Sequence, residues 1–147
     1  MVIYKNSAPT ASALIVKGNN VLLSTRAIKP KKGYYDIVGG FLSNGESPEV
    51  GVIRETKEET GLTVKILDLL GVYMDTYAFQ EIKLNTLNFY YVTEIVEGKM
   101  EPHDDVATLK WFDIDKVPLD KLAFRSQKEV VKDLKDWIRK NKKQIVK

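Results

Sequence analysis

Short apolar runs separated by polar turns make up most of this chain. The runs are richer in β-branched and aromatic residues than helices usually are, and the tripeptide GNN after residue 17 is typical of a tight turn between two strands. The pattern predicts strands at residues 11–17, 21–26, 34–38, 64–74, 84–95 and 109–114.

The last long segment, residues 126–141, is predicted to be a helix instead. Ser126 is the expected N-cap, because a serine hydroxyl can accept a hydrogen bond from the first helical turn. Four apolar residues recur at helical spacing, so one stripe of this helix should pack on the sheet. They are Val130, Leu134, Trp137 and Ile138.

Composition limits the class of protein. With 147 residues, of which 44% are hydrophobic, the chain suits a single domain over residues 1–147 with one core. It has no apolar run long enough to span a bilayer, and its first ten residues do not form a basic segment followed by an apolar one. We therefore expect a cytoplasmic protein with no membrane partner.

Cysteine usage and charge narrow the chemistry. Cysteine is absent, which excludes disulfides, thiolate metal sites and cysteine nucleophiles. Any metal must therefore bind to oxygen ligands or to His103, the one histidine. The net charge of +3 is modest and its excess lies largely in the C-terminal tail, so no nucleic-acid partner is expected.

Residues 39–62 gather five acidic residues, two basic residues and five glycines in 24 positions. Ser47 as N-cap, Pro48 at the first helical position and Gly61 as C-terminal stop predict a helix of about thirteen residues. At about 100° per residue, one face of this helix carries three carboxylates and another carries a stripe directed toward the core. The carboxylates are Glu55, Glu58 and Glu59, and the stripe is Val52, Ile53, Thr56 and Thr60.

Carboxylates at this spacing repel one another, so the arrangement needs a compensating cation. Arg54 can serve one of them, but one guanidinium cannot neutralise three carboxylates. Mg²⁺ and Mn²⁺ prefer oxygen ligands and are commonly shared between protein carboxylates and substrate phosphates. Gly39, Gly40 and Gly45 allow a bent loop whose backbone can approach a phosphate. Together these features favour a phosphate-handling metal site over a solvated acidic face balanced by Arg54 and Lys57.

The spacing of these residues resembles the Nudix box, the signature of the Nudix hydrolase family. Gly40 is followed after five residues by Glu46, and after seven more by the run RETKEETGL, which starts at Arg54. Two positions depart from the pattern: Thr56 stands in an aliphatic place and Val38 in the place of a proline. Neither departure removes a ligand.

The resemblance extends to roughly residues 9–138 and is closest to the ADP-ribose and NADH pyrophosphatases. It implies an α/β fold in which a mixed β-sheet is sandwiched between helices, an α/β/α arrangement. It also implies that Mg²⁺, or Mn²⁺, is bound by the carbonyl oxygen of Gly39 and by the side chains of Glu55, Glu58 and Glu59.

Carried over in the same way, the catalytic residues are Glu55, Glu58, Arg54 and Asp105. Arg54 would orient the glutamates through a salt bridge, while Glu58 or Glu55 would accept the proton from the attacking water. Asp105 stands where relatives have an acidic residue that adds a ligand or acts as base. Other groups close to it in the sequence are Glu101, His103 and Asp104.

The resemblance implies hydrolysis of a nucleoside diphosphate linked to a group X, which gives a nucleoside monophosphate and X-phosphate. ADP-ribose or a related dinucleotide is the favoured substrate, and nucleoside triphosphates such as oxidised dGTP are second. The substrate-binding residues are predicted to be Arg26, Tyr35, Gly40 and Tyr77, where the tyrosines would stack on a base, with ordinary core or sheet packing as the alternative for each ring.

Other functions remain as alternatives. Some Nudix domains are ligand-binding regulators without hydrolysis, but these typically lose box glutamates that this chain retains. Removal of RNA caps is a third reading, suggested by the basic C-terminal helix, although positive charge there also complements the helix dipole. The sequence does not show the oligomeric state, but the resemblance raises a homodimer as one option, because dimers are frequent among relatives of the ADP-ribose type.

Overall fold

The computed structural model describes residues 6–79 and 81–147, apart from the side chains of Tyr77, Phe79 and Ile82. The strands are β1 (Ala8–Lys17), β2 (Asn20–Arg26), β3 (Tyr35–Asp36), β4 (Gly39–Phe41), β5 (Thr63–Phe79), β6 (Ile82–Glu97) and β7 (Val106–Asp113). The helices are α1 (Pro48–Thr60) and α2 (Gln127–Lys140), with 3₁₀ turns η1 (Ile114–Lys116), η2 (Leu119–Lys121) and η3 (Lys142–Gln144). No helix in the described part of the chain is long and apolar enough to cross a membrane.

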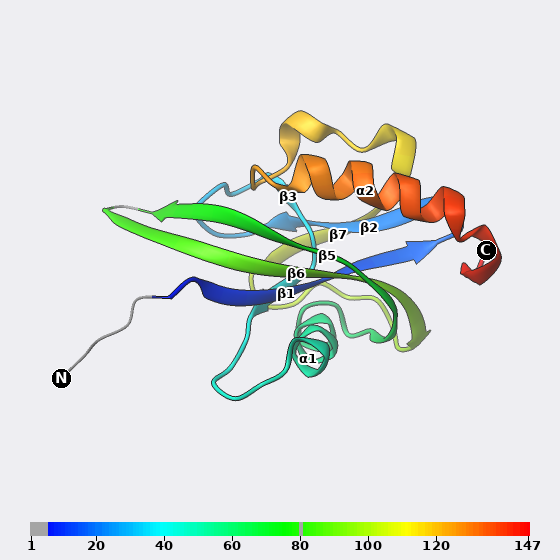
Figure 1. Cartoon of the computed structure of the whole chain (residues 1–147), viewed down its shortest axis with the longest axis horizontal. Coiled ribbons are helices and arrows are strands. Elements are labelled where there is room, and N and C mark those ends of the chain that lie inside the picture. The colour runs from blue at the N-terminus through cyan, green and yellow to red at the C-terminus, as the bar shows by residue number, and fades with distance from the viewer. Residues whose placement is uncertain (1–5, 80) are drawn as a thin grey trace.

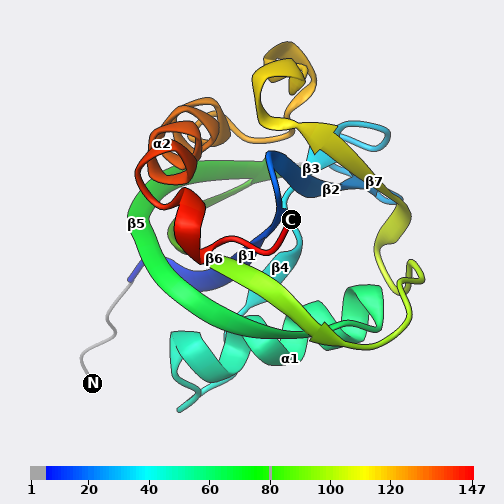
Figure 2. The same cartoon turned by 90° about the vertical axis from the view of Figure 1, so that its right-hand side faces the viewer.

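The strands form one mixed sheet between the two helices. The main path runs β3-β2-β1-β6-β5, with β4 paired to β1 and β7 paired to β2. β1 and β6 are parallel, whereas the other pairs are antiparallel. α2 covers one face and α1 the other (Figures 1 and 2). The predicted α/β/α fold with a mixed sheet is therefore confirmed.

The centre of the sheet explains why both helices are needed. β1 is buried continuously from residue 11 to residue 16, as expected of a strand covered on both faces. Its Leu14 and Val16 join the cluster beneath α2, while Ala11, Ala13 and Ile15 join the cluster beneath α1. The small alanines leave room for α1 to approach the sheet, which brings the loop before α1 close to β1.

Helix α1 has the predicted bounds and caps. The Ser47 side chain accepts a bond from the Val50 N–H, and Gly61 ends the helix in a left-handed conformation. Val52, Thr56 and Thr60 are buried, but Ile53 is 37% exposed, so its assignment to the core stripe is wrong. The stripe is narrower than expected because the helix meets the sheet along one row of side chains.

The Thr56 departure from the Nudix box is structural, as expected. Its hydroxyl is buried and donates to the Val52 carbonyl oxygen at 2.7 Å, and the Thr60 hydroxyl donates to the Thr56 carbonyl oxygen at 2.6 Å. Each polar atom is therefore satisfied within the helix itself.

The N-cap prediction for α2 is wrong in its detail. Ser126 precedes the helix, but its backbone is already helical and its side chain makes no capping bond. The Ser126 hydroxyl donates instead to Asp75 on β5. A contact across 51 residues of sequence has replaced the local one.

The sheet differs from the predicted strands in two places. The stretch 34–38 is not one strand, because the chain passes from pairing with β2 at Tyr35 to pairing with β1 at Gly39. β5 and β6 run longer than predicted and pair from Thr63 with Glu97 to Phe79 with Ile82. The far end of β5 and β6 projects beyond β1 as a two-stranded ribbon (Figure 1). This part of the sequence has no pattern of core residues, so the extra length was not predicted.

Candidate active site

Two glycines at the start of the site allow the backbone and a carboxylate to approach each other closely. β4 pairs with β1 through Gly39 opposite Ser12 and Gly40 opposite Ala11. A Cβ added to Gly40 would lie 2.6 Å from the Glu55 carboxyl carbon, and one on Gly39 would overlap the backbone of β1. A side chain is thus excluded at Gly39, and one at Gly40 would displace the Glu55 carboxylate, which α1 places directly above β4.

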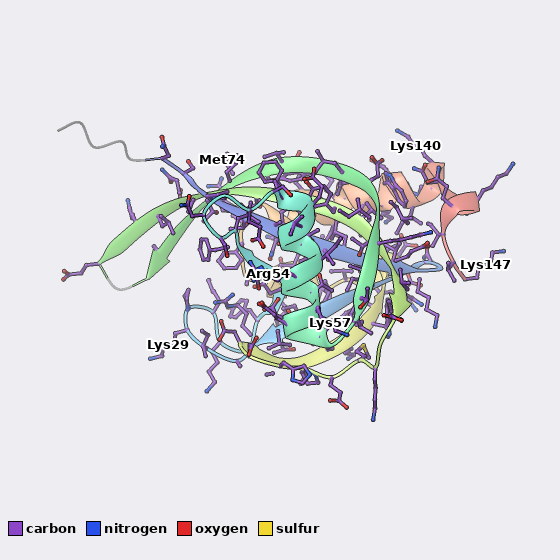
Figure 3. All side chains as sticks on the ribbon, turned by 90° about the horizontal axis from the view of Figure 1, so that it is seen from below. Lys29, Arg54, Lys57, Met74, Lys140 and Lys147 are labelled. Carbon is purple, nitrogen blue, oxygen red and sulfur yellow. The ribbon has the colours of Figure 1, made fainter. Side chains whose placement is uncertain are left out.

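Arg54 is the hub of the charged face of α1, which Figure 3 views from below. Its Nε and Nη2 donate to the two carboxylate oxygens of Glu46 at 2.7 and 2.8 Å. Its Nη1 donates to Glu55 at 3.1 Å and to Glu58 at 3.0 and 3.1 Å. The guanidinium therefore orients both glutamates through salt bridges.

Glu46 makes the shortest hydrogen bonds with Arg54 among these three glutamates. Its carboxylate also accepts the Ser43 N–H at 3.0 Å, so it ties the loop before α1 to the helix. The Arg54 guanidinium, with the Ser43 N–H, lowers the pKa of Glu46 to about 2. The same contact with Glu46 raises the pKa of Arg54. Glu46 therefore stays ionised and holds one side of Arg54 while the other side reaches Glu55 and Glu58.

Glu59 lies apart from Arg54 and faces the pocket. Its Oε1 accepts the Gly39 N–H at 2.8 Å. Burial, followed by the charges of Glu55, Asp36 and Asp105, raises the pKa of Glu59 to about 8 despite that hydrogen bond. The buried and acidic surroundings of Glu59 therefore disfavour its ionised form.

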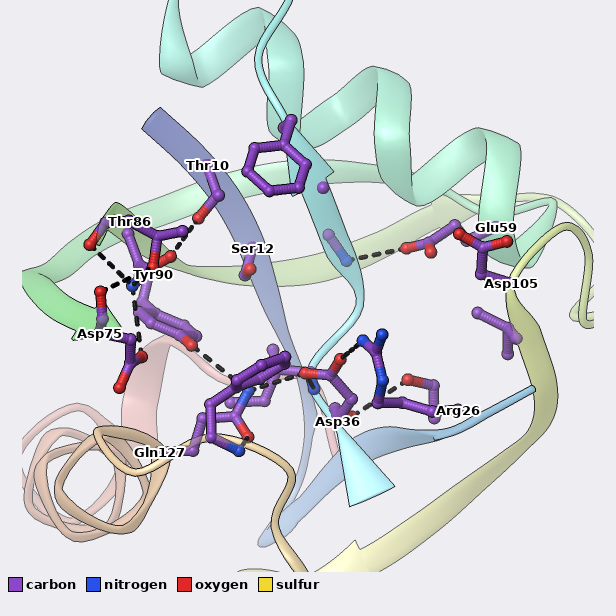
Figure 4. Close-up of a pocket in the computed structure, with 18 of the residues that line it drawn as sticks. Thr10, Ser12, Arg26, Asp36, Glu59, Asp75, Thr86, Tyr90, Asp105 and Gln127 are labelled. Atoms are coloured by element: carbon purple, nitrogen blue, oxygen red, sulfur yellow. Dashed lines mark hydrogen bonds and ion pairs between the residues drawn. The ribbon is translucent and has the colours of Figure 1, made fainter. Parts of the chain in front are cut away.

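Asp105 lies opposite Glu59 at one end of the pocket (Figure 4). The loop that carries it is anchored to the end of α1, since the Glu101 N–H donates to the Thr60 carbonyl oxygen and the His103 N–H to the Glu59 carbonyl oxygen. His103 itself is exposed and lies 4.0 Å from a Glu101 oxygen. Neither His103 nor Asp104 lines this pocket, so Asp105 is the residue of the loop that reaches it.

The carboxylates fit a divalent cation by their chemistry. Burial raises the pKa of Glu59, and it raises that of Glu55 even though Arg54 lies beside it, so additional positive charge would stabilise both ionised carboxylates. Within residues 6–79 and 81–147, no three carboxylate or imidazole side chains already converge on one point. Arg54 holds Glu55 and Glu58, and Gly39 holds Glu59, so a shared ion would have to replace some of these contacts.

The pocket itself has a volume of about 190 Å³ and an acidic lining. Four carboxylates line it, whereas Arg26 is its one cationic residue among those described. The Arg26 guanidinium is already engaged with Asp36 at 2.9 Å and the Pro30 carbonyl oxygen at 2.7 Å, and it lies over the Phe124 ring. A diphosphate would meet net repulsion here unless cations accompanied it. The four acidic residues are Asp36, Glu59, Asp75 and Asp105.

The floor of the pocket was not found by reading the sequence. Asp36 is largely buried, with Oδ2 on Arg26 and Oδ1 on the Gln127 side-chain amide at 2.7 Å. Burial raises the pKa of Asp36, because these hydrogen bonds only partly offset the desolvation. Gln127 is buried and 91 residues distant in sequence, so no local signal links it to Asp36.

The end of the pocket away from Glu59 is polar and tied together by side-chain bonds (Figure 4). Asn88 donates to the Tyr73 carbonyl oxygen and the Thr86 hydroxyl, and it accepts from Thr10. Asp75 accepts the backbone N–H of Ser126 at 2.9 Å. Thr86 and Asn88 are two residues apart on β6 and therefore point to the same face, and asparagine is depleted in strands, so this signal was available in the sequence.

The predicted substrate-binding residues divide into three groups. Arg26 and Gly40 line the pocket. Tyr35 does not line it, because its ring packs edge-on against Phe112 at 5.0 Å in the core. The side chain of Tyr77 lies outside the described residues.

The contact between Gly40 and Glu55 gives a first prediction. Gly40→Ala should displace the Glu55 carboxylate and lower kcat by about tenfold to a hundredfold, with little change in the midpoint of thermal unfolding, because the tip of a glutamate can move. Steady-state kinetics and thermal melts measure both. In a Glu55→Ala background, the same change should add almost nothing. An additive loss there would show that Gly40 acts through another group.

The environment of Glu59 gives a second prediction. Its pKa is about 8 in the folded protein against a reference value of 4.5, so the folded state retains a proton that the unfolded chain loses between these values. The free energy of unfolding should therefore fall as pH rises from about 4.5 to about 8 in the absence of metal. Glu59→Gln should reduce this slope, leaving the smaller contributions of Glu55 and Asp36. Urea unfolding at several pH values in EDTA tests it, and an unchanged slope in the variant would contradict it.

Known proteins match this chain along most of its length. A NUDIX domain family model matches residues 6–134. A protein of Methanocaldococcus jannaschii named ADP-ribose pyrophosphatase is 34% identical over 135 residues, which cover 92% of this chain and 77% of that protein. NAD-capped RNA hydrolase NudC of Pseudomonas aeruginosa is 31% identical over 116 residues, covering 78% of this chain. The match covers 39% of that longer relative.

Solved structures agree with the fold. A UDP-X diphosphatase is 28% identical with a TM-score of 0.76, over 93% of this chain and 64% of that one. The NUDIX domain of Shewanella oneidensis NrtR, solved with ADP ribose, is 20% identical with a TM-score of 0.74, over 92% of this chain and 90% of that one, and it supports the fold alone. By the family model, these relatives and its intact glycine and glutamate spacing, the chain belongs to the NUDIX domain family and is a hydrolase of that family.

Proposed function

We propose that this chain is a divalent-cation-dependent hydrolase of nucleoside diphosphate-X compounds, with ADP-ribose or a related dinucleotide as the favoured substrate. The observation that carries the proposal is the continuity of the site. The face of α1 that carries Glu55, Glu58 and Glu59 adjoins the pocket, because Glu59 and Gly39 are bonded to each other and both line it. The far end of that pocket is polar and partly uncharged. The relative from M. jannaschii, named ADP-ribose pyrophosphatase, supports this choice of substrate.

The metal would be held by the carbonyl oxygen of Gly39 and the side chains of Glu55, Glu58 and Glu59, with Mg²⁺ or Mn²⁺ suited to such oxygen ligands. Bound there, it would neutralise phosphate oxygens and lower the pKa of a water. Arg54 keeps Glu55 and Glu58 aimed toward β4, and Glu46 keeps Arg54 in place. Asp105 faces the same space from the opposite loop, where it can add a ligand or take a proton.

The reaction adds one water across the diphosphate. A new bond forms from the water oxygen to one phosphorus, the bond from that phosphorus to the bridging oxygen breaks, and the bridging oxygen leaves with the other phosphate while the water proton passes to the carboxylate cluster. Glu55 and Glu58 are the candidate acceptors. Burial raises the pKa of Glu55 above its ordinary value, which makes its carboxylate a better proton acceptor. The products are a nucleoside monophosphate and the phosphate ester of X.

Hydrolysis of nucleoside triphosphates is the second candidate. A pocket of about 190 Å³ lies below the roughly 300–1,000 Å³ common for ligand sites, which suits one nucleoside better than two. A panel of ADP-ribose, NADH, nucleotide sugars and nucleoside triphosphates separates these functions by kcat/KM, with products identified. Highest efficiency on a triphosphate would overturn the dinucleotide choice, and binding without turnover would favour a ligand-binding regulator.

The expectation of a homodimer stays a prediction. Sedimentation equilibrium over a range of protein concentrations measures it directly.

A further inference from the structure

The loop that carries Asp105 joins β6 to β7 and comprises residues 98–105, called the Asp105 loop below. It starts beside the end of α1, because Thr63, the first residue of β5, pairs with Glu97, the last residue of β6. The side chains of the Asp105 loop are all exposed. Packing in the core therefore does not fix its position, and backbone contacts take that role.

Two of these backbone contacts join the Asp105 loop to α1. The N–H groups of Glu101 and His103 donate to the carbonyl oxygens of Thr60 and Glu59, both at 2.9 Å. These carbonyl groups belong to the last turn of the helix, where a carbonyl has no partner within the helix itself. The Asp105 loop is therefore docked on the end of the helix that carries the proposed metal ligands.

Glu59 takes part in both regions. Its backbone carbonyl accepts the His103 N–H, while its side chain accepts the Gly39 N–H of β4 at 2.8 Å. Asp105 lies opposite this side chain (Figure 4). A shift of the Asp105 loop relative to α1 therefore changes the separation between Asp105 and the Glu59 carboxylate.

Two glycines allow the Asp105 loop to approach α1 this closely. A Cβ added to Gly98 would lie 2.5 Å from the Gly61 carbonyl oxygen and 3.2 Å from the Leu62 Cα, and one on Gly61 would lie 2.7 Å from the Lys99 carbonyl oxygen. These are backbone atoms, so no rotation of a side chain can relieve the overlap. Gly98 also has a φ of +108°, which residues with a side chain rarely adopt. A side chain at position 98 must therefore move the Asp105 loop away from α1.

A tight turn at the end of the loop directs Asp105 toward the pocket. The Val106 N–H donates to the His103 carbonyl oxygen at 3.2 Å, and the second residue of this turn, Asp104, has a φ of +55°. Turns with a positive φ at that position are dominated by glycine, asparagine and aspartate. The Ala27 N–H donates to the Asp105 carbonyl oxygen at 2.8 Å and holds the other side of the turn. Asp105 lines the pocket and Asp104 does not, so the conformation at residue 104 decides which of the two reaches it.

We propose that Gly98 and Asp104 are positioning residues for hydrolysis, which hold Asp105 opposite the carboxylates of α1 through their backbone conformations. The proposal rests on the proposed function, in which Asp105 adds a ligand or takes a proton. Gly98 and Asp104 do not contact the substrate, and the Asp104 carboxylate has no role of its own. Both residues act through Asp105, so replacing them should matter only while Asp105 is present.

The first test compares Gly98→Ala with Gly18→Ala, using Mg²⁺ and the nucleotide of the panel with the highest kcat/KM. Gly18 lies in the turn between β1 and β2 and also has a positive φ, +59°, but an added Cβ there would meet no atom within 4 Å. Gly98→Ala should lower kcat by about tenfold or more, with KM within about twofold of the wild type. Gly18→Ala should keep the wild-type kcat. In an Asp105→Ala background, Gly98→Ala should change kcat by less than about twofold.

Amide hydrogen exchange followed by NMR tests the docking without catalysis. The amide hydrogens of Glu101 and His103 are the ones bonded to α1. Gly98→Ala should speed their exchange by about tenfold or more, while the amide of Ile15 in the buried strand β1 keeps its wild-type rate and so shows that the variant folds. Unchanged exchange at Glu101 and His103 would contradict the role of Gly98.

Two substitutions at residue 104 separate conformation from charge. Asparagine accepts a left-handed backbone as aspartate does, whereas the β-branched valine is strongly disfavoured there. Asp104→Asn should therefore keep kcat within about twofold of the wild type, and Asp104→Val should lower it by about tenfold. Equal losses in both variants would show that the carboxylate acts directly and would overturn the proposal for Asp104.

The outcomes also separate this inference from the proposed function. A Gly98→Ala protein with the wild-type kcat would overturn the inference, and so would an equally large loss in the absence of Asp105. In both cases the wild type still hydrolyses its substrate, so the proposed function stands. A wild type that hydrolyses no compound of the panel with Mg²⁺ would remove the proposed function, and with it the reaction that these residues serve.

Discussion

Replacing Glu58 by glutamine is expected to lower kcat on the order of 10³-fold or more while leaving the fold intact. The Glu58 side chain is 47% exposed, so an amide of the same size should disturb little packing. A neutral amide keeps the size of the side chain but removes the charge of a proposed metal ligand and candidate proton acceptor. Steady-state hydrolysis with saturating Mg²⁺ and circular dichroism measure the two effects.

Glu49→Gln is the matched control for this result. Glu49 lies on the same helix and accepts the Tyr91 hydroxyl at 3.2 Å, a bond that a glutamine oxygen can also accept. We expect nearly wild-type turnover in this variant. Turnover in Glu58→Gln equal to that of Glu49→Gln would show that Glu58 is not part of the metal face.

Replacing Arg54 by alanine should have the next largest effect, because three carboxylates lose their shared cation at once. We expect kcat to fall by about a hundredfold and the free energy of unfolding to decrease at neutral pH. The pKa of Glu46, about 2 in the folded protein, lies below its reference value of 4.5. Its stabilising contribution is therefore present above pH 4.5 and is lost as pH falls toward 2. The instability of Arg54→Ala should shrink in the same window.

Arg54→Lys separates charge from geometry. A lysine ammonium cannot make the paired bonds to Glu46 while also reaching Glu55 and Glu58, so its kcat should lie between those of the wild type and alanine variants. Added Mg²⁺ should stabilise Arg54→Ala more than the wild type, since a metal restores part of the missing charge. Urea unfolding with and without Mg²⁺ measures this. An Arg54→Ala protein as stable as the wild type without metal would contradict the role of Arg54 as a hub.

The arrangement of the charged side chains on the α1 face was predictable from the sequence because all its parts are local. Ser47, Gly61 and the glutamates lie within one helix, where spacing fixes direction. Gly40, which precedes the helix, was also informative, since a side chain at this position would collide with the Glu55 carboxylate. The family pattern then linked these residues to Asp105, which a local reading alone does not connect with α1.

The pocket floor was not readable, because it depends on contacts between distant segments. Asp36 meets Gln127, and Asp75 meets Ser126, only after α2 has packed on the sheet. Because of the same packing, Ser126 does not cap α2 as expected. The placement of Tyr35 was missed for a related reason. Its aromatic ring suits stacking on a base and packing in a core equally well, and it is the contact with Phe112 on β7 that places the ring in the core.

The most direct test of the central claim is ³¹P NMR of ADP-ribose incubated with the wild-type protein, with Mg²⁺ in one sample and EDTA in the other. We expect the diphosphate signals to be replaced by those of AMP and ribose 5-phosphate with Mg²⁺, and to persist in EDTA and with Glu58→Gln. Diphosphate signals that persist in the wild-type sample with Mg²⁺, or that disappear equally in EDTA, would contradict it.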